Sequence, residues 1–467
     1  MAAGSEMRVL GLALKWLIIL VLSAIVAIAA WLYFAPPDLI RVGTGYAAKI
    51  VCSNVYIAGR DPQEVLAVDV QAPGHPILKL VRVDVDRGAG TVSAALFGIF
   101  GKSTAVARDG LGCASVPDGD VSRAKESVLP AISPVDGSDA VWPEGERADS
   151  SNPHVKAILD DDGMTGQGMR AVVVVHNGRI VGERYGPGFS AATPLLGWSM
   201  TKTVNAALIG TVIAEGRVQL EDAGFFEQWE GDGRSGITLS DLMAMSSGLQ
   251  FNEDYGDVTD VTRMLYLQPD MAGFAADKQI ESSSGGVFNY SSGTAVIIAR
   301  IWQDLFDDPQ VSLAWPRKAL FDPLGMTSAV METDATGTFV GSSYGFATAH
   351  DWARFGQFLL QNGEWGGRQL LPEGFAQWMR EPAPASNGEY GRGQVWLHGP
   401  QAGTPDGQDP DAGFELPEDA FWLLGHDGQS TAIVPSKNLV VVRLGLTPTK
   451  LGYKPQAMVA ALSKVLD

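Results

Sequence analysis

The stretch LLGWSMTKTVNAALIGTVIAEGRV, residues 195–218, is the part of the sequence from which the fold follows. Apolar residues lie on nearly every side of the helix that this stretch predicts, so we expect it to be buried between two layers of structure and to end near Gly216. Ser199 and Lys202 stand at the start of this helix and would share one face. Because the helix dipole disfavours a cation in the first turn, local helix stability does not explain Lys202.

This pair has the residue types that nucleophilic catalysis needs. A lysine held inside the protein has a lowered proton affinity and can accept the proton of a serine hydroxyl, while the N–H of Ser199 can hold a developing oxyanion. In the alternative interpretation, Ser199 only caps the helix and Lys202 lies on the surface. Thr201 breaks the G-x-S-x-G pattern, which excludes the nucleophile elbow of α/β-hydrolases. A second S-x-x-K, residues 122–125, lies in a polar segment that would not desolvate its lysine.

Strand and helix patterns around this stretch predict an α+β domain over residues 166–467. Residues 171–186 form a hairpin pattern around Asn177-Gly178. Helical patterns dominate from about 199 to 380, and an amphipathic stretch closes the chain. Further strand patterns occur at 394–398, 421–426, 430–435 and 439–445. Strands at both ends with helices between them predict one sheet built from distant segments, with an inserted helical lobe.

Three regions precede this domain. Residues 1–35 contain the uncharged run Trp16–Phe34, which is about long enough to cross a bilayer as a helix. Residues 38–125 alternate apolar runs with turns and predict a small strand-rich module. Its predicted strands lie at 49–59, 65–70, 77–86 and 90–101. Residues 126–165 are rich in Pro, Asp, Gly and Ser, which predicts a linker or wrapping arm.

The charges beside the apolar run predict its orientation. Arg8 and Lys15 precede it, so the N-terminus is expected in the cytoplasm and the bulk of the chain outside. A cleaved signal peptide is the alternative, but the run stays apolar beyond the small residues Ala27 and Ala29. We therefore expect a single-pass anchor in the inner (cytoplasmic) membrane, with the remaining chain in the periplasm.

Cysteine content and charge limit the partners. Cys52 and Cys113 are the only cysteines, and in an exported chain they predict one disulfide, with two buried thiols as the alternative. Neither the cysteines nor the six histidines have a metal-site spacing, so we expect no metal and no cofactor. A net charge of −19 and the absence of a basic run exclude a nucleic-acid binder. The sequence does not determine the oligomeric state.

Five segments carry a family resemblance that covers about two-thirds of the chain. They are GWSMTKTVNAALIG (197–210), ITLSDLMAMSSGLQFNEDY (237–255), FNYSSGTAVIIARI (288–301), the segment 320–365, and LLGHDGQSTAIVPSKNLVVVRLG (423–445). In this order they resemble the serine β-lactamase and penicillin-recognising superfamily, nearest to its class C-like branch of esterases and 6-aminohexanoate-oligomer hydrolases. The resemblance implies a β-lactamase-like fold, an antiparallel sheet flanked by helices with an inserted helical lobe.

The resemblance also implies catalytic roles. Ser199 is the nucleophile, Lys202 its base, and Tyr290 the group that relays a proton to the leaving group. Tyr290-Ser291-Ser292 matches the family's Tyr-x-Asn, with Ser292 in place of the asparagine that helps to hold substrate and lysine. The alternative for Tyr290 is a core tyrosine before an apolar helix.

Substrate-binding residues follow from the same resemblance. His426-Asp427-Gly428 matches Lys-Thr-Gly, where Gly428 permits close approach of a ligand and the N–H of Gln429 is the second oxyanion donor. His426 replaces a lysine that binds a carboxylate, which favours a neutral ester or amide; a half-buried, satisfied histidine is the alternative. Tyr255 resembles a tyrosine that overhangs the site in the oligomer hydrolases, although loop tyrosines often only pack.

The expected protein is thus a membrane-anchored serine hydrolase that cleaves a small ester or amide through an acyl-enzyme. Two alternatives remain open. One is β-lactamase or D-Ala-D-Ala carboxypeptidase-like activity, and the other is a non-catalytic binding protein on the same fold.

Overall fold

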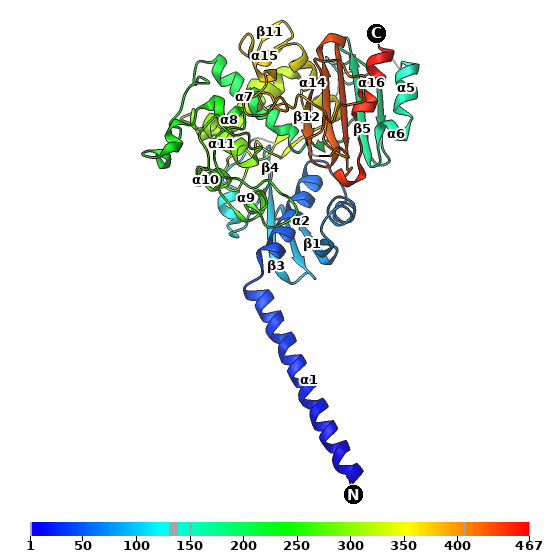
Figure 1. Cartoon of the computed structure of the whole chain (residues 1–467), viewed down its shortest axis with the longest axis vertical. Helices are drawn as coiled ribbons and strands as arrows, with labels where there is room; N and C mark the ends of the chain where they lie inside the picture. Colours follow the sequence, from blue (N-terminus) through cyan, green and yellow to red (C-terminus); the bar gives the residue numbers. More distant parts are fainter. Residues whose placement is uncertain (1, 130–138, 149–151, 406, 467) are drawn as a thin grey trace.

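The computed structural model describes residues 2–129, 139–148, 152–405 and 407–466. Helix α1 (Ala2–Phe34) extends away from the rest of the molecule as a single rod (Figure 1). Within it, Arg8–Phe34 is long and apolar enough to cross a membrane, and the protein does not bury it. A membrane anchor and a signal sequence both have this length and composition, so the helix agrees with either.

The N-terminal module begins with helices where the sequence pattern predicted strands. Helix α2 (Asp38–Tyr56) is followed by the short helix α3 (Pro62–Val65) and by a π-helical turn, η1 (Leu66–Gln71). The predicted strands at 49–59 and 65–70 are therefore wrong. Their β-branched residues favour strands locally, but α2 buries most of its side chains, and tertiary packing outweighs that preference.

The strand prediction is correct for the second half of the module. After a short 3₁₀ helix, η2 (Pro76–Leu80), four antiparallel strands pair in chain order. They are β1 (Val81–Asp86), β2 (Thr91–Leu96), β3 (Phe100–Arg108) and β4 (Gly112–Ser115). The predicted disulfide is present and joins Cys52 of α2 to Cys113 of β4, whose Cα atoms lie 6.1 Å apart.

The module shares one hydrophobic core with the rest of the chain. Lys49 of α2 donates from Nζ to Glu332 Oε2 at 2.5 Å, and the two side chains are 1% and 0% exposed. The Tyr46 ring packs edge-on against Tyr266, with ring centroids 5.7 Å apart. Since these contacts are buried, α2 is a fixed part of the larger fold.

The main sheet combines strands from both ends of the large domain, as predicted. Its antiparallel order is β12-β13-β14-β5-β6. The strands are β5 (Met169–His176), β6 (Arg179–Tyr185), β12 (Phe421–Gly425), β13 (Gln429–Val434) and β14 (Leu439–Gly445). Asn177 and Gly178 form the predicted turn, with φ of 50° and 73°. Residues 394–398 form no strand, only isolated bridges at Trp396, because Gln394 has a left-handed backbone, φ 59°.

Helices cover both faces of this sheet, and Figure 1 shows the layers. Alternate residues of β5 point to opposite sides: Val173 and Val175 join the large core, and Val172 and Val174 join a second, smaller core. Helix α14 (Ala349–Leu360) packs on the first face, and α5 (Pro153–Leu159) and α16 (Gln456–Val465) lie over the second.

In the sequence, the inserted helical lobe comes between β6 and β12, whereas in the sheet β14 pairs directly with β5. Helix α7 (Met200–Ala214) leads into it from a small sheet of β7 (Leu195–Leu196), β9 (Gly345–Ala347) and β8 (Val330–Met331). The remaining helices of this region are α8 (Leu239–Met243), α9 (Asp260–Leu267), α10 (Met271–Ala276), α11 (Ser292–Asp304), α12 (Pro309–Pro316), α13 (Asp322–Leu324) and α15 (Phe375–Arg380).

Part of the predicted wrapping arm packs firmly on the domain. Trp142 is 0% exposed, and Arg354 of α14 donates to the carbonyls of Pro143 and Gly145. Residues 130–138 and 149–151 of the predicted arm lie outside the described residues.

Candidate active site

Ser199 stands at the junction between β7 and α7. Trp198 adopts a left-handed backbone, φ 49°, and this turn precedes Ser199 at the N-cap of α7. The Ser199 side chain makes no capping hydrogen bond and instead lines a cavity of about 760 Å³. The alternative in which Ser199 only caps the helix is therefore wrong.

Lys202 lies one helical turn further, 1% exposed, behind the Ser199 hydroxyl. Its Nζ donates to Ser199 Oγ at 3.2 Å, to Ser292 Oγ at 3.1 Å and to the Ser342 carbonyl at 3.1 Å. Burial lowers the pKa of Lys202 to about 8, although the Glu253 carboxylate acts in the opposite direction. The surface-lysine alternative is wrong. In a fraction of the molecules, the Lys202 side chain is uncharged near physiological pH.

Tyr290 approaches the same hydroxyl from the segment before α11. Its side chain lines the same cavity as Ser199, and its ring centroid lies 4.6 Å from Lys202 Nζ. Burial raises the pKa of the Tyr290 hydroxyl, while the nearby Ser199 hydroxyl works against this rise. The phenol therefore stays protonated. It can donate or relay a proton, but it does not act as a base in the resting enzyme.

Glu253 belongs to this cluster and was missed by the sequence analysis. Ser292 donates to it twice, from Oγ to Oε1 at 2.5 Å and from the backbone N–H to Oε2 at 2.7 Å. Burial raises the pKa of the Glu253 carboxyl, and the positive charge of Lys202 opposes the rise. Ser292 thus bridges Lys202 to a carboxylate, in the position where the resemblance implies an asparagine. The replacement of that asparagine by Ser292 was the signal in the sequence that could have pointed to Glu253, because it leaves Lys202 without the amide neighbour that the resemblance implies.

His426 and Tyr255 form an aromatic wall of the cavity. The two rings lie 5.3 Å apart at 30°, and the edge of Trp198 contacts His426 with a centroid distance of 5.6 Å. The His426 side chain is 43% exposed, and its nearest carboxylate oxygen belongs to Asp427 at 3.6 Å. It therefore faces the cavity and is not an enclosed, satisfied histidine.

The β12–β13 connection brings the predicted oxyanion strand to Ser199. A Cβ on Gly425 would lie 2.2 Å from the Gly197 carbonyl, so the two backbones touch there. Gly428 has φ 82°, a left-handed conformation that favours glycine. The Gln429 side chain is turned to Gly445, with hydrogen bonds of 2.8 and 2.5 Å, so any contact with a bound carbonyl would come from its main chain.

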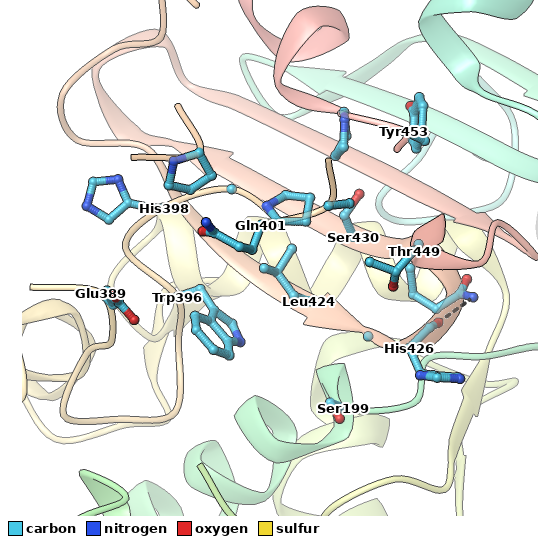
Figure 2. A pocket seen from close by; sticks show the side chains of 18 of the residues that line it. Ser199, Glu389, Trp396, His398, Gln401, Leu424, His426, Ser430, Thr449 and Tyr453 are labelled. Atoms are coloured by element: carbon cyan, nitrogen blue, oxygen red, sulfur yellow. Dashed lines mark hydrogen bonds between the residues drawn. The ribbon is translucent and has the colours of Figure 1, made fainter. Parts of the chain in front are cut away.

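One cavity unites the predicted residues (Figure 2). Its lining includes Ser199, Tyr255, Tyr290, His426, Gly428 and Gln429, together with Glu253. Lys202 and Ser292 are buried directly behind it. Within the described residues, one group near the rim has ligand atoms close enough for a metal ion, namely His398, Asp409 and Asp411. The expectation of no metal remains a prediction.

Comparisons with known proteins agree with this fold. Residues 159–455 match a family model described as Beta-lactamase. A protein described as a 6-aminohexanoate-dimer hydrolase from Bacillus anthracis is 24% identical, with a TM-score of 0.51 over 66% of this chain and 80% of that chain. A protein described as a β-lactamase from Bacteroides dorei DSM 17855 is 19% identical, with a TM-score of 0.53 over 67% and 98%. A penicillin binding protein from Bacillus halodurans is 14% identical, with a TM-score of 0.50 over 67% and 100%.

No relative was found among curated proteins. At these identities the structural likeness concerns the fold alone. Together with the family match, it confirms the predicted α+β architecture, an antiparallel sheet flanked by helices with an inserted helical lobe.

Proposed function

Because the chain belongs to the β-lactamase family, we propose that it is a serine hydrolase that cleaves an ester or amide through an acyl-enzyme. One observation carries the proposal: Ser199 Oγ lies 3.2 Å from the Nζ of a buried lysine, and that Nζ lies 4.6 Å from the ring centroid of Tyr290. A non-catalytic binding protein would need neither contact, and the lowered pKa of Lys202, about 8, suits a general base.

In the first half of the reaction, neutral Lys202 takes the proton of Ser199 as Oγ attacks the substrate carbonyl. The backbone N–H groups of Ser199 and Gln429 hold the resulting oxyanion. As the intermediate collapses, Tyr290 gives its proton to the leaving group and recovers one from the Lys202 ammonium. The products are the acylated serine and the protonated leaving group, and Lys202 is neutral again.

In the second half, Lys202 takes a proton from the water that attacks the acyl-enzyme carbonyl. As the bond between that carbonyl carbon and Ser199 Oγ breaks and the acid is released, the Lys202 ammonium returns the proton to Ser199 Oγ. Both halves form a buried ammonium for a short time. The Glu253 carboxylate, joined to Lys202 through Ser292, would stabilise that charge. Glu253 is therefore a positioning residue that also balances charge.

His426 favours substrates without the carboxylate that β-lactams and stem peptides present. The ring faces the cavity where the family resemblance places a lysine. A neutral ester or amide is thus the proposed substrate class, with β-lactamase or carboxypeptidase-like activity as the alternative outcome of a screen.

We also infer an extracytoplasmic location with α1 as a single-pass anchor. The exposed apolar helix and the disulfide between Cys52 and Cys113 support this, because disulfides persist in oxidising compartments. Protease added to spheroplasts should digest the catalytic domain, and full protection of that domain would contradict the location.

The chemistry is tested by covalent labelling and a substrate screen. A fluorophosphonate should label the wild-type protein at Ser199, and the Ser199→Ala variant should not react. Ser122→Ala is the matched control, since it removes the serine of the other S-x-x-K, and it should label normally. Short-chain p-nitrophenyl esters, linear amides and nitrocefin then distinguish esterase, amidase and β-lactamase activity. An unlabelled Ser199 in folded protein would refute the proposal.

A further inference from the structure

The charged side chains that line the cavity are acidic. Among the described residues that line it, none is lysine or arginine, whereas four are acidic: Glu253, Glu389, Asp409 and Asp427. Lys454 donates to Thr404 on the rim loop and does not line the cavity. A substrate that brings an anion into this space would therefore meet repulsion, and one that brings a cation would meet attraction.

Two of these acidic residues, Glu389 and Asp409, lie at one end of the cavity, with Asp411 next to them. Glu389 neighbours the rim segment directly, because the Leu397 N–H donates to its carbonyl at 3.0 Å. In the same segment, His398 Nδ1 lies 3.1 Å from Asp411 and 3.4 Å from Asp409. Three carboxylates thus accompany one imidazole, and this end is negative whether or not the histidine is protonated. Figure 2 shows Glu389, Trp396 and His398 toward one end of the cavity and His426 toward the other, with Ser199 between them.

Glu389 is the carboxylate that remains free for a ligand. Glu253 is bonded to Ser292, Asp409 accepts the Asp411 N–H, and Asp427 is buried beside His426. Within the described part of the chain, the exposed Glu389 side chain makes no hydrogen bond or ion pair.

Trp396 supplies the second recognition element. Its partly buried ring lines the cavity and packs on Tyr290, with centroids 5.2 Å apart, and on Tyr390, 4.9 Å apart. A tryptophan held in place by two tyrosines and adjoining a free carboxylate is a favourable environment for an organic cation, which gains cation–π attraction and charge pairing together.

From these features we propose that the leaving group of the substrate carries an amine or quaternary ammonium group, bound over Trp396 and against Glu389. The leaving-group side is assigned because Trp396 packs against Tyr290, the residue that protonates the leaving group in the proposed function, on which this inference rests. Specificity for a cation also agrees with His426 in place of the carboxylate-binding lysine.

A pair of isosteric reagents tests the charge alone. O,O-diethyl phosphorothiolates with an S-(2-trimethylammonioethyl) or an S-(3,3-dimethylbutyl) leaving group have the same shape and differ by one positive charge. In each reaction Ser199 Oγ forms a bond to phosphorus, the P–S bond breaks, and the thiol departs with the serine proton. The second-order rate constant for Ser199 modification is measured on the full-length protein with each reagent and divided by that reagent's rate constant with hydroxide. The value for the cationic reagent divided by the value for the neutral reagent is the corrected ratio.

We expect the corrected ratio to favour the cationic reagent by on the order of tenfold. Glu389→Gln should lower the ratio several-fold, and Glu389→Lys should lower it below one. Glu364→Gln removes an exposed carboxylate outside the cavity and should leave the ratio unchanged.

The two possible failures are distinguishable. If a fluorophosphonate labels Ser199 but the corrected ratio is one or less, or neither phosphorothiolate reacts, the inference alone is wrong. A ratio that Glu389→Gln does not change would also overturn it. If the fluorophosphonate does not label Ser199 in folded protein, the proposed function fails, and the inference fails with it.

Discussion

The chain contains the tetrapeptide pattern S-x-x-K twice, in two physically different settings. Ser122 and Lys125 lie at the four-residue helix α4 (Val121–Ala124), both exposed, and Lys125 donates to the Ala89 carbonyl at the surface. Lys202 is 1% exposed and donates to the hydroxyl of Ser199, which lines the candidate active-site cavity. The same four letters give a solvated surface in one place and a desolvated nucleophile–base pair in the other. Burial, not the motif, supplies the chemistry.

Replacing each of the two lysines tests this difference directly. Lys202→Met should slow acylation of Ser199 by ~10²–10⁴-fold, because the hydroxyl loses its base. Lys125→Met should change the rate very little, since an exposed lysine makes no contact with the cavity. Stopped-flow measurement of the ester burst checks both variants. Equal effects of the two substitutions would contradict the assigned base.

Lys49 is a third lysine to compare with these two. It is buried like Lys202, but it pairs directly with a carboxylate. Lys49→Met leaves Glu332 as a buried, unpaired charge and should reduce the free energy of unfolding by roughly 3–5 kcal/mol. Lys202→Met should cost much less stability, because Lys202 donates to two hydroxyls and a carbonyl and has no carboxylate in direct contact that the substitution would leave unpaired. Chemical denaturation of the two variants measures the difference. A larger loss in Lys202→Met would place Lys202 among the structural residues.

The smallest expected effect is a shift in the pH dependence of acylation. Lys202 must be neutral to act, so kcat/KM should rise with pH through about 8 in the wild-type enzyme. Glu253 raises the pKa of Lys202, and Glu253→Gln removes that negative charge, so the midpoint should move to lower pH. Glu281→Gln, at an exposed carboxylate outside the cavity, should leave the midpoint unchanged. A midpoint that moves upward in Glu253→Gln would mean that another group titrates.

Much of the fold could be predicted because its signals are local. The hairpin at Asn177-Gly178, the three C-terminal strands β12 to β14 and the buried helix α7 each follow from a short periodic pattern. The errors fell where packing decides. Helix α2 has a strand-like composition, yet burial against β2, β3 and β4 holds it helical. Residues 394–398 have a strand-like pattern, but a left-handed Gln394 prevents regular pairing.

The sequence by itself determined the features that depend on neighbours along the chain: the serine and lysine on one helical face, the apolar first helix and the alternation of the sheet strands. Only the tertiary structure decided what surrounds them. Ser292 meets Glu253 across 39 positions and Lys202 across 90, and Lys49 meets Glu332 across 283. Contacts of this range leave no periodic trace in the sequence, because each arises when separate elements pack together and expel water from between them. That packing lowers the pKa of Lys202 and turns a common motif into a candidate catalytic pair.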